Sequence, residues 1–309
     1  MKQIVKRYVP ASWIAVARRL EGRLVIRSEF RKDRRRFAAH AAPADGAATP
    51  KVRARNLEAQ VTKDYHRVEK GLALREPRRP FGAAVARRLD LLVPAAAGSN
   101  YSEYALSAHA ALSEWNEHGV VSDEVSPARR VERGSFSEYE QFFSSRHSVR
   151  DFDGQPVENS VFERAVELAI NSPSVCNRQA WRVRVYSGFD AVGNVLSFQN
   201  GNTGFADVPS VALVTVDTRL FTGVEERNQG WIEGGIFSMS LVWALHAMNV
   251  DTCMLNMSVR NKRTDAMRAA LGLDDSELVI MMIAAGYGRP GHRVARSPHR
   301  AVRDVLSLE

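Results

Sequence analysis

Apolar and polar positions in the second half of the chain alternate between helical and strand spacing. From 156 to 171 the apolar residues recur on one helix face, and Ser160 and Glu163 are spaced as a capping box at its start. A longer apolar stretch predicts a second helix over 229–248. Short runs rich in β-branched residues predict four buried strands, at 182–186, 210–216, 250–255 and 278–285. This alternation predicts an α+β fold, an α/β sandwich, for residues 136–309.

The region before this domain has a helical pattern instead. Leu57, Val61, Tyr65 and Val68 follow one another at helical spacing, and Gly71 is placed to end that helix. A further helix is predicted over 101–118. We therefore expect a mainly helical region over 51–135, with the polar stretch 122–135 as its boundary and the small-residue stretch 41–50 as the linker that precedes it.

Residues 1–40 form a basic, partly amphipathic extension. They carry 12 Lys and Arg against three Asp and Glu, so the rest of the chain is almost neutral although the whole has a formal net charge of +8. Two interpretations stay open: a solvated helix packed on its own protein, or a segment that binds an anionic membrane surface or another polyanion. Nothing in the pattern indicates sequence-specific nucleic-acid binding.

Composition and missing motifs exclude several classes. A hydrophobic content of 45% with 25% charged residues is typical of globular proteins, and apolar runs such as 278–285 are too short to span a membrane. The two cysteines, Cys176 and Cys253, have no disulfide or metal spacing, which favours a reducing, cytoplasmic compartment and no metal site. The GxGxxG match at 286–291 is followed by prolines rather than a helix, so we do not interpret it as a dinucleotide site.

Two segments carry candidate binding chemistry. Arg146, Ser148 and Arg150 alternate, so in an extended segment they point to one side, where guanidinium and hydroxyl groups suit a phosphate. A basic surface strand would have the same pattern. The loop 171–181 offers Asn177 and Gln179, whose amides suit the edge of a planar heterocycle.

The order of these pieces resembles the FMN-dependent nitroreductase-like family over about residues 140–309. RHSVRDF is followed by a helix, SPSVCNRQAWRVRVY, a long helix ending in HAMNVDTCMLN, and a strand running into GYGRP. The resemblance implies a central mixed sheet flanked by helices, bound FMN and a homodimer. Ala180 departs from the family pattern, where a proline is usual, and the N-terminal extension has no counterpart in the minimal fold.

The resemblance also implies roles for residues that match the family motifs. The RxSxR-like segment would contact the phosphate and pyrimidine edge of the flavin, the PSxxNxQPW-like loop would lie across a flavin, usually the partner's, and the loop after the third strand would approach N5. A basic residue near the C-terminus would return to the phosphate, with His299 a further possibility there. The matching cofactor-binding positions are Arg146, His147, Ser148, Arg150, Pro173, Ser174, Val175, Asn177, Leu255, Asn256, Met257, Arg296 and Arg300.

The function implied is an FMN-dependent oxidoreductase. It would transfer electrons from NADH or NADPH through the flavin to a small nitroaromatic- or quinone-like acceptor by a ping-pong mechanism, without a catalytic side chain, because the flavin carries the chemistry. The alternative is a non-catalytic binding or scaffolding protein that keeps the fold and acts through its basic N-terminus on a membrane surface or polyanion.

Overall fold

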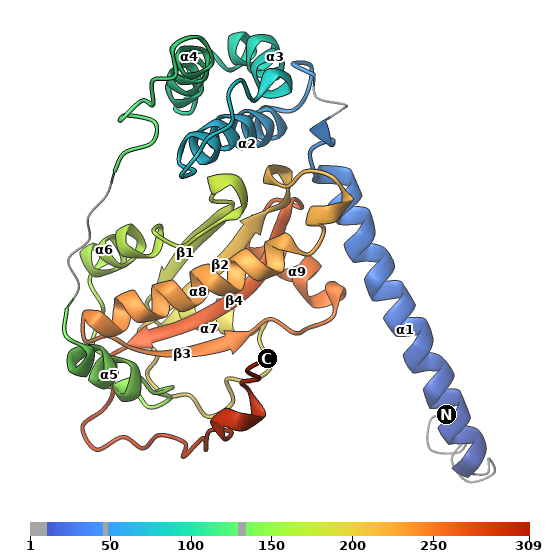
Figure 1. Cartoon of the computed structure of the whole chain (residues 1–309). Coiled ribbons are helices and arrows are strands. Elements are labelled where there is room, and N and C mark those ends of the chain that lie inside the picture. The colour runs from blue at the N-terminus through green and yellow to red at the C-terminus, as the bar shows by residue number, and fades with distance from the viewer. Residues whose placement is uncertain (1–10, 46–48, 129–133) are drawn as a thin grey trace.

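The chain folds around a four-stranded sheet with helices on both faces, and the helices of residues 54–118 lie beyond one end of the sheet (Figure 1). The computed structural model describes residues 11–45, 49–128 and 134–309, so residues 1–10, 46–48 and 129–133 of the predicted extension, linker and boundary lie outside the described residues. The elements are α1 Ala11–His40, α2 Ala54–Leu72, α3 Ala83–Leu92, α4 Ser102–His118, α5 Phe136–Ser145, α6 Asn159–Ala169, β1 Trp181–Ser187, α7 Phe189–Leu196, β2 Ser210–Asp217, α8 Gln229–Ala247, β3 Asp251–Asn256, α9 Asn261–Leu271 and β4 Glu277–Gly286.

The strands lie in the order β1-β2-β4-β3, and each neighbouring pair is antiparallel. In the β2–β4 ladder Val214 pairs with Met281 and Thr215 with Val279, so the register shifts between these positions. Beyond β3, Ser148 forms a parallel bridge with Thr252. The four strands thus form an antiparallel sheet and not the mixed sheet predicted, and among the described residues parallel pairing occurs only in isolated bridges such as this one.

Alternation along the strands sends their side chains into two separate cores. On β2, Ala212, Val214 and Val216 face the core formed with α6 and α8. Val211 and Leu213 face the other core, formed with α7, α9 and the segment around Phe152. All eight β2 residues are buried, which explains why this strand reads as a continuous apolar run rather than as an alternation.

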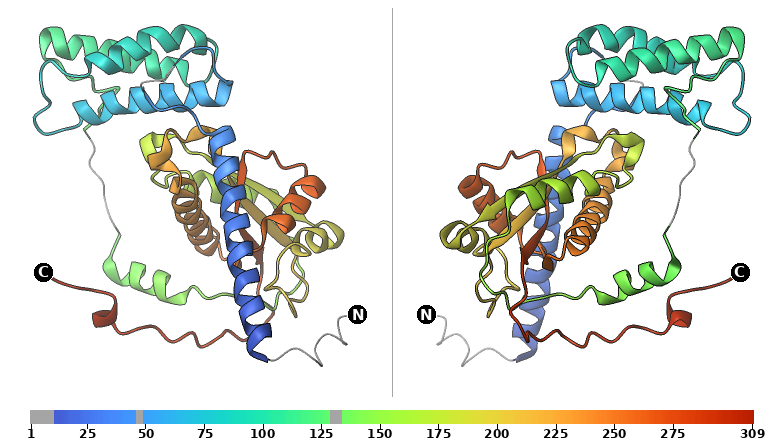
Figure 2. Two further views of the ribbon diagram at one scale, coloured as in Figure 1. Left: turned by 90° about the vertical axis from the view of Figure 1, so that its right-hand side faces the viewer. Right: turned by 90° about the vertical axis from the view of Figure 1, so that its left-hand side faces the viewer.

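The N-terminal helices are arranged differently from this domain. Helices α2, α3 and α4 share an apolar cluster of their own, which includes Leu57, Val61 and Leu112. Helix α1 leaves the body so that its N-terminal half lies away from the sheet and its covering helices (Figures 1 and 2). No helix among the described residues is both long and apolar enough to cross a membrane.

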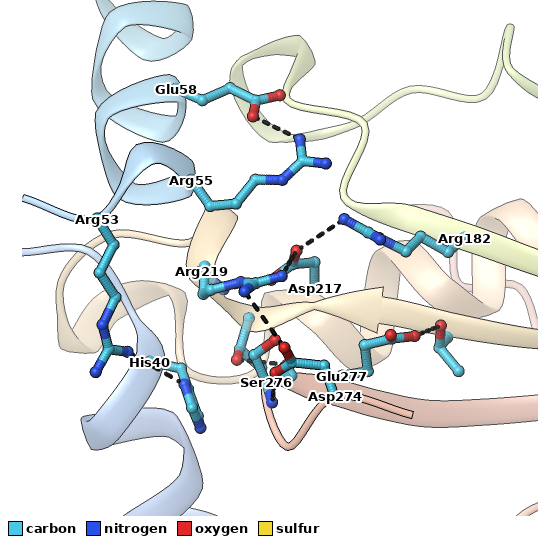
Figure 3. A network of polar contacts seen from close by, with 12 residues as sticks. His40, Arg53, Arg55, Glu58, Arg182, Asp217, Arg219, Asp274, Ser276 and Glu277 are labelled. Atoms are coloured by element: carbon cyan, nitrogen blue, oxygen red, sulfur yellow. Dashed lines mark hydrogen bonds and ion pairs between the residues drawn. The ribbon is translucent and has the colours of Figure 1, made fainter. Parts of the chain in front are cut away.

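Polar side chains at the start of α2 lie close to a network of polar contacts at the ends of β1 and β2 (Figure 3). Asp217, which is fully buried, accepts hydrogen bonds from Arg182 at 3.2 Å and from Arg219 at 2.8 Å. Arg219 also lies 3.5 Å from the carboxylate of Asp274. The backbone oxygen of Arg219 accepts from Asn56 on α2 at 2.9 Å, so the helical region is tied directly to the sheet.

The four predicted strands are confirmed to within one residue at each end, and the predicted long helix is α8. The predicted capping box at Ser160 and Glu163 is wrong. The backbone stays extended through Glu158, so Ser160 lies inside α6 and donates to the Glu158 carboxylate instead. The capping box of the domain is formed by Ser135 and Glu138 at the start of α5.

Gly71 was predicted to end α2 as the glycine that follows its last turn, and this role is wrong. The helix continues to Leu72, and Gly71 lies inside its last turn. An added Cβ at Gly71 would lie 2.4 Å from the ring of Phe81, so glycine is required there for packing. After β4, the described chain from Tyr287 to Ala301 contains no helix, as expected for a GxGxxG match without a dinucleotide fold.

Candidate functional site

Five of the predicted cofactor-binding residues line one cavity of about 380 Å³: Arg146, His147, Ser148, Arg150 and Arg296. The RHSVR segment forms one wall directly after α5, where Val149 N–H donates to Thr252 O at 3.0 Å and fixes the segment beside β3. Helix α8 forms the second wall, and the C-terminal segment around Arg296 forms the third. The lining residues are Phe143, Ser144, Arg146, His147, Ser148, Arg150, Met239, Trp243, Ala295, Arg296, Ser297 and His299.

The charges of this cavity are not balanced by the protein. Arg146, Arg150 and Arg296 all line it, and no carboxylate of the described residues lies within 4.0 Å of their guanidinium groups. Arg150 donates to the backbone oxygen of Ser148 at 3.2 Å. Three guanidinium groups without an internal counter-ion make the cavity a site for an anion such as a phosphate.

Aromatic side chains line the same cavity. The Arg146 guanidinium lies 5.9 Å from the centre of the Trp243 ring, within cation–π range. Phe143 and Trp243 pack against each other with ring centroids 4.6 Å apart. Ser145 and His246 are 2.9 Å apart, which holds the end of α5 against α8. The cavity thus combines a cationic end with an apolar, aromatic wall, the combination typical of cofactor pockets.

Cys253 lies behind this cavity, in the core of the second sheet face. Burial raises the pKa of its thiol, although Arg150, Arg146 and a hydrogen bond with Ser148 act in the opposite direction. A buried thiol whose pKa is raised is not a reactive thiolate. Cys253 therefore serves as a small apolar residue in the packing between β3 and the RHSVR segment.

The predicted cofactor-binding residues of the loop 173–177 do not lie in this cavity. Pro173 and Asn177 are exposed, Ser174 and Val175 are half-buried, and Ser172, directly before them, donates to Ser240 of α8 at 2.6 Å. Val175 N–H donates to Glu233 on that helix at 2.7 Å. Because a helix rises about 1.5 Å per residue, Trp243 of the cavity is about 15 Å further along α8 than Glu233. The loop does not line the cavity of its own chain.

Of the predicted residues at the end of β3 and near the C-terminus, only some line the cationic cavity. Leu255 and Met257 are buried in the second core, and Met257 also borders a different cavity beside α1. Asn256 is exposed, and its side-chain oxygen accepts from the backbone N–H of Ser258 at 3.1 Å. Of the two C-terminal arginines, Arg296 lines the cationic cavity, whereas Arg300 is exposed and does not.

The sequence analysis did not identify the α8 side chains that line the cavity, nor the α8 side chain that contacts the loop 173–177. Trp243 and Met239 lie within a long apolar helix, where nothing in the sequence separates a cavity wall from a core residue. Glu233 had a readable signal: it is the single acidic residue of α8 and is flanked by apolar and glycine residues. Its side chain is buried, and burial raises its pKa.

Comparison with known proteins places this architecture. The model of the Nitroreductase family matches residues 143–192, a segment that contains both the RHSVR wall of the cavity and the loop 173–177. A solved Bacillus subtilis protein that carries the nitroreductase name superimposes with a TM-score of 0.50 at 18% identity, over 57% of this chain and 100% of that one.

Two further solved structures have lower scores. A nitroreductase-like protein from Streptococcus mutans gives a TM-score of 0.48 at 17% identity, and a nitroreductase with bound FMN from Desulfitobacterium hafniense gives 0.44 at 18%; each match spans 57% of this chain and 100% of the other. The resemblance to the nitroreductase family is thus confirmed, by the family model over residues 143–192 and by the fold over the C-terminal part of the chain.

Proposed function

We propose that the protein is an FMN-dependent oxidoreductase whose flavin phosphate binds in the cationic cavity. The observation that carries this proposal is the convergence of Arg146, Arg150 and Arg296, from two distant segments, on one cavity where none of them pairs with a carboxylate of the described residues. The RHSVR wall lies inside the segment that matches the Nitroreductase family model. Several solved neighbours carry names that include FMN or NADH, which agrees with the proposal.

The residues present fit this cofactor. The guanidinium groups of Arg146 and Arg296 and the hydroxyl of Ser148 supply donors for a phosphate, and His147 adds a ring nitrogen at the same place. Phe143 and Trp243 supply an apolar surface next to these donors. A cavity of about 380 Å³ is of the size that small-molecule cofactors occupy.

Bound FMN would supply the electron transfer, and the chain's own residues would bind, orient and tune it. The guanidinium of Arg150 would stabilise negative charge at the cofactor, because a fixed cation costs no reorganisation when charge develops. NADH or NADPH would be the donor, and a nitroaromatic- or quinone-like molecule the acceptor, each using the same open face in turn in a ping-pong cycle. No side-chain nucleophile is needed. The proposed compartment is the cytoplasm, in keeping with two free cysteines.

We further propose that two copies of the chain complete the site. The loop 173–177 does not line the cavity of its own chain, and its contact Glu233 lies about 9 Å along α8 from Met239 of the cavity, so we infer that a second copy brings such a loop to the cavity. Helix α8 also carries an exposed apolar row: Ile232 and Ile236, one turn apart, are 53% and 39% exposed. Burying these side chains against a second copy would stabilise a homodimer by removing apolar surface from water.

The spectrum of the purified protein tests the proposed function. We expect flavin absorption, release of FMN on heating, and bleaching by NADH or NADPH. A colourless protein that also fails to bind added FMN would overturn the proposal.

One observation favours a second function for α1, the binding or scaffolding alternative. Trp13, Leu20 and Leu24 are 72%, 54% and 65% exposed, Val16, Ile26 and Phe30 are exposed on other sides of the helix, and Arg23 and Arg27 are exposed among them. A basic helix with exposed apolar residues suits an anionic membrane surface. The structure shows that a deletion to test this must stop before Glu29, because residues 29–40 are docked on the body. Removal of residues 2–28 should abolish binding to anionic vesicles and leave flavin binding unchanged.

A further inference from the structure

The loop that begins at Pro173 has an unusual backbone. Cys176, Asn177 and Gln179 have φ angles of 49°, 51° and 48°, in the left-handed region that non-glycine residues rarely adopt. Such a conformation is strained for a residue that has a side chain and persists only when its surroundings hold it in place. Some part of the protein must therefore hold this loop, and two buried charged residues contact it.

The first of these residues is Glu233. Its side chain accepts from Val175 N–H at 2.7 Å and from Gln229 Nε2 at 3.1 Å, both at the same carboxylate oxygen. Glu233 is 1% exposed, and a carboxylate in such surroundings is costly unless it is hydrogen-bonded. An acidic residue inside an otherwise apolar helix face thus bonds the loop backbone, where a leucine would pack at lower cost.

The second is Arg178, whose side chain is fully buried beneath the same loop. Its Nε donates to Val175 O at 3.1 Å, and its guanidinium lies 2.7 Å from the carboxylate of Glu226. Glu233 and Arg178 therefore bind the N–H and the C=O of one residue, Val175, from different sides. This arrangement fixes the backbone immediately before the left-handed residues Cys176 and Asn177.

The arrangement also extends to the N-terminal helices. The Thr222 hydroxyl lies 3.5 Å from Arg178 and accepts from Lys63 of α2 at 2.6 Å. Lys63 in turn forms an ion pair with Asp45 at 3.0 Å. Helix α2 contacts the 3₁₀ turn at Val175–Asn177, so this helix supports the loop from its outer side.

We propose that Glu233 and Arg178 are positioning residues that hold the loop 174–177 in the conformation in which it contacts FMN. The inference rests on the proposed function, since it assigns the loop a place at a flavin, that of the partner copy. Neither residue touches the cofactor. Glu233 acts through Val175 N–H and Arg178 through Val175 O, and Lys63 links this support to α2.

Hydrogen–deuterium exchange of the full-length protein without FMN tests the first part. Glu233→Ala should speed exchange of the peptide 173–179 about tenfold, because the Val175 amide loses its acceptor. Glu233→Gln keeps an acceptor oxygen and should stay within about threefold of the wild type. Glu163→Ala, an exposed glutamate on α6, is the matched control and should change nothing. Unchanged exchange in a folded Glu233→Ala protein would overturn the inference.

FMN titration tests the second part. Glu233→Ala should weaken FMN binding about tenfold, and Glu233→Gln should restore it. A faster-exchanging loop with wild-type FMN affinity would show that the loop does not hold the flavin and would overturn this part. If the wild type itself binds no FMN, the proposed function fails together with the flavin role, while the exchange result still decides whether Glu233 holds the loop.

A second variant keeps the inference falsifiable if Glu233→Ala does not fold. Arg178→Lys retains a positive charge near Glu226 but removes the Nε–H that donates to Val175 O. It should also speed exchange of the peptide 173–179 and weaken FMN binding. Wild-type behaviour in both measurements would overturn the role of Arg178.

Discussion

Glu29 of α1 caps the N-terminus of α9 by accepting from both the backbone N–H of Asn261, at 2.7 Å, and its side-chain amide, at 2.9 Å. Two turns further along α1, Arg36 reaches Asp265 at 3.0 Å and Asp275 at 3.2 Å. The last turns of the basic helix are therefore docked on the body by pairs of opposite charge, whereas Trp13 and its neighbours are exposed.

The Glu29–Asn261 contact leads to the first prediction. Glu29→Ala should loosen the docked part of α1 and cost about 1 kcal/mol, the usual effect of losing a helix cap. Trypsin should then cleave faster at the exposed Arg34 and Arg35, as followed by mass spectrometry. Glu21→Ala, on the free half of α1, is the control and should leave the cleavage rate unchanged. Equal rates for the Glu29 variant and the wild type would contradict the capping role.

The pH dependence of this contact has a definite sign. The hydrogen bond from the backbone N–H of Asn261 lowers the pKa of Glu29 below its ordinary value of 4.5. A carboxylate with a lowered pKa stabilises the docked helix above that value, and the contribution is lost as the pH falls through the folded-state pKa. The cleavage difference between Glu29→Ala and the wild type should therefore shrink in acid, with an acid-stable protease replacing trypsin.

The pair Arg184–Glu277 gives a second prediction, on global stability. Arg184 donates two hydrogen bonds of 2.7 Å to the Glu277 carboxylate, which is buried between β1 and β4. Burial alone would raise the pKa of Glu277, but the hydrogen bonds from Arg184 and Thr215 outweigh it and hold the pKa below the ordinary 4.5. Arg184→Met should cost about 3 kcal/mol, because it leaves a buried carboxylate without its partner.

Urea unfolding at a series of pH values checks this. The loss in the free energy of unfolding should be complete near neutral pH and should diminish as the pH falls from 4.5 through the lower folded-state pKa of Glu277, where the wild-type carboxylate is protonated and the ion pair is lost. Arg164→Met is the matched control, since Arg164 pairs with Glu167 on the exposed face of α6. A pH-independent loss would show that packing of the Arg184 stem, and not the ion pair, stabilises the sheet.

Adjacent glycines of α8 allow a third prediction with a built-in control. A Cβ at Gly234 would lie 2.6 Å from Ile280 of β4, whereas a Cβ at Gly235 meets nothing within 4 Å. Gly234→Ala should destabilise the protein by about 1–3 kcal/mol through overpacking between the helix and the sheet. Gly235→Ala should stabilise it by up to about 1 kcal/mol, because alanine favours the helix. Thermal unfolding that moves both variants in the same direction would contradict this geometry.

Much of the fold could be predicted because its two central strands, β2 and β4, are buried on both faces. Runs such as 210–216 and 278–285 are continuous and β-rich, so their identity does not depend on distant contacts. The RHSVR pattern likewise predicted a cluster of cationic side chains, and the structure brings it together with Arg296. Its assignment to a flavin phosphate stays a prediction.

Other features depend on contacts that no local pattern encodes. The docking of α1 rests on pairs such as Arg36–Asp265, which are 229 positions apart. The role of Arg178 was missed because a basic residue in a loop normally points to solvent, while here it is buried by Phe221 and paired with Glu226. That the loop 173–177 and the cavity contact different parts of α8 also depends on tertiary packing, which no sequence motif shows.

The two C-terminal arginines make a fourth prediction, on the cofactor. Arg296 lines the cationic cavity and Arg300 does not, so Arg296→Ala should weaken FMN binding about tenfold while Arg300→Ala leaves it unchanged. Riboflavin, which lacks the phosphate, should bind the wild type and Arg296→Ala equally. Fluorescence titration measures both ligands. If Arg300→Ala weakens FMN and Arg296→Ala does not, the tail adopts another arrangement when the cofactor is bound.

The exposed row on α8 gives the last prediction. If Ile232 and Ile236 are covered by a second copy, Ile236→Asp places a charge in an apolar interface and should weaken dimerisation about 100-fold, or about 2.8 kcal/mol. Light scattering coupled to size exclusion should show a dimer for the wild type and a monomer for the variant. Leu168→Asp, equally exposed on α6, is the control and should remain dimeric. Because the loop 173–177 does not line the cavity of its own chain, the monomeric variant should also lose FMN while keeping its fold by circular dichroism. A monomer that retains wild-type FMN affinity would mean that one chain suffices to bind the flavin and that the loop serves another purpose.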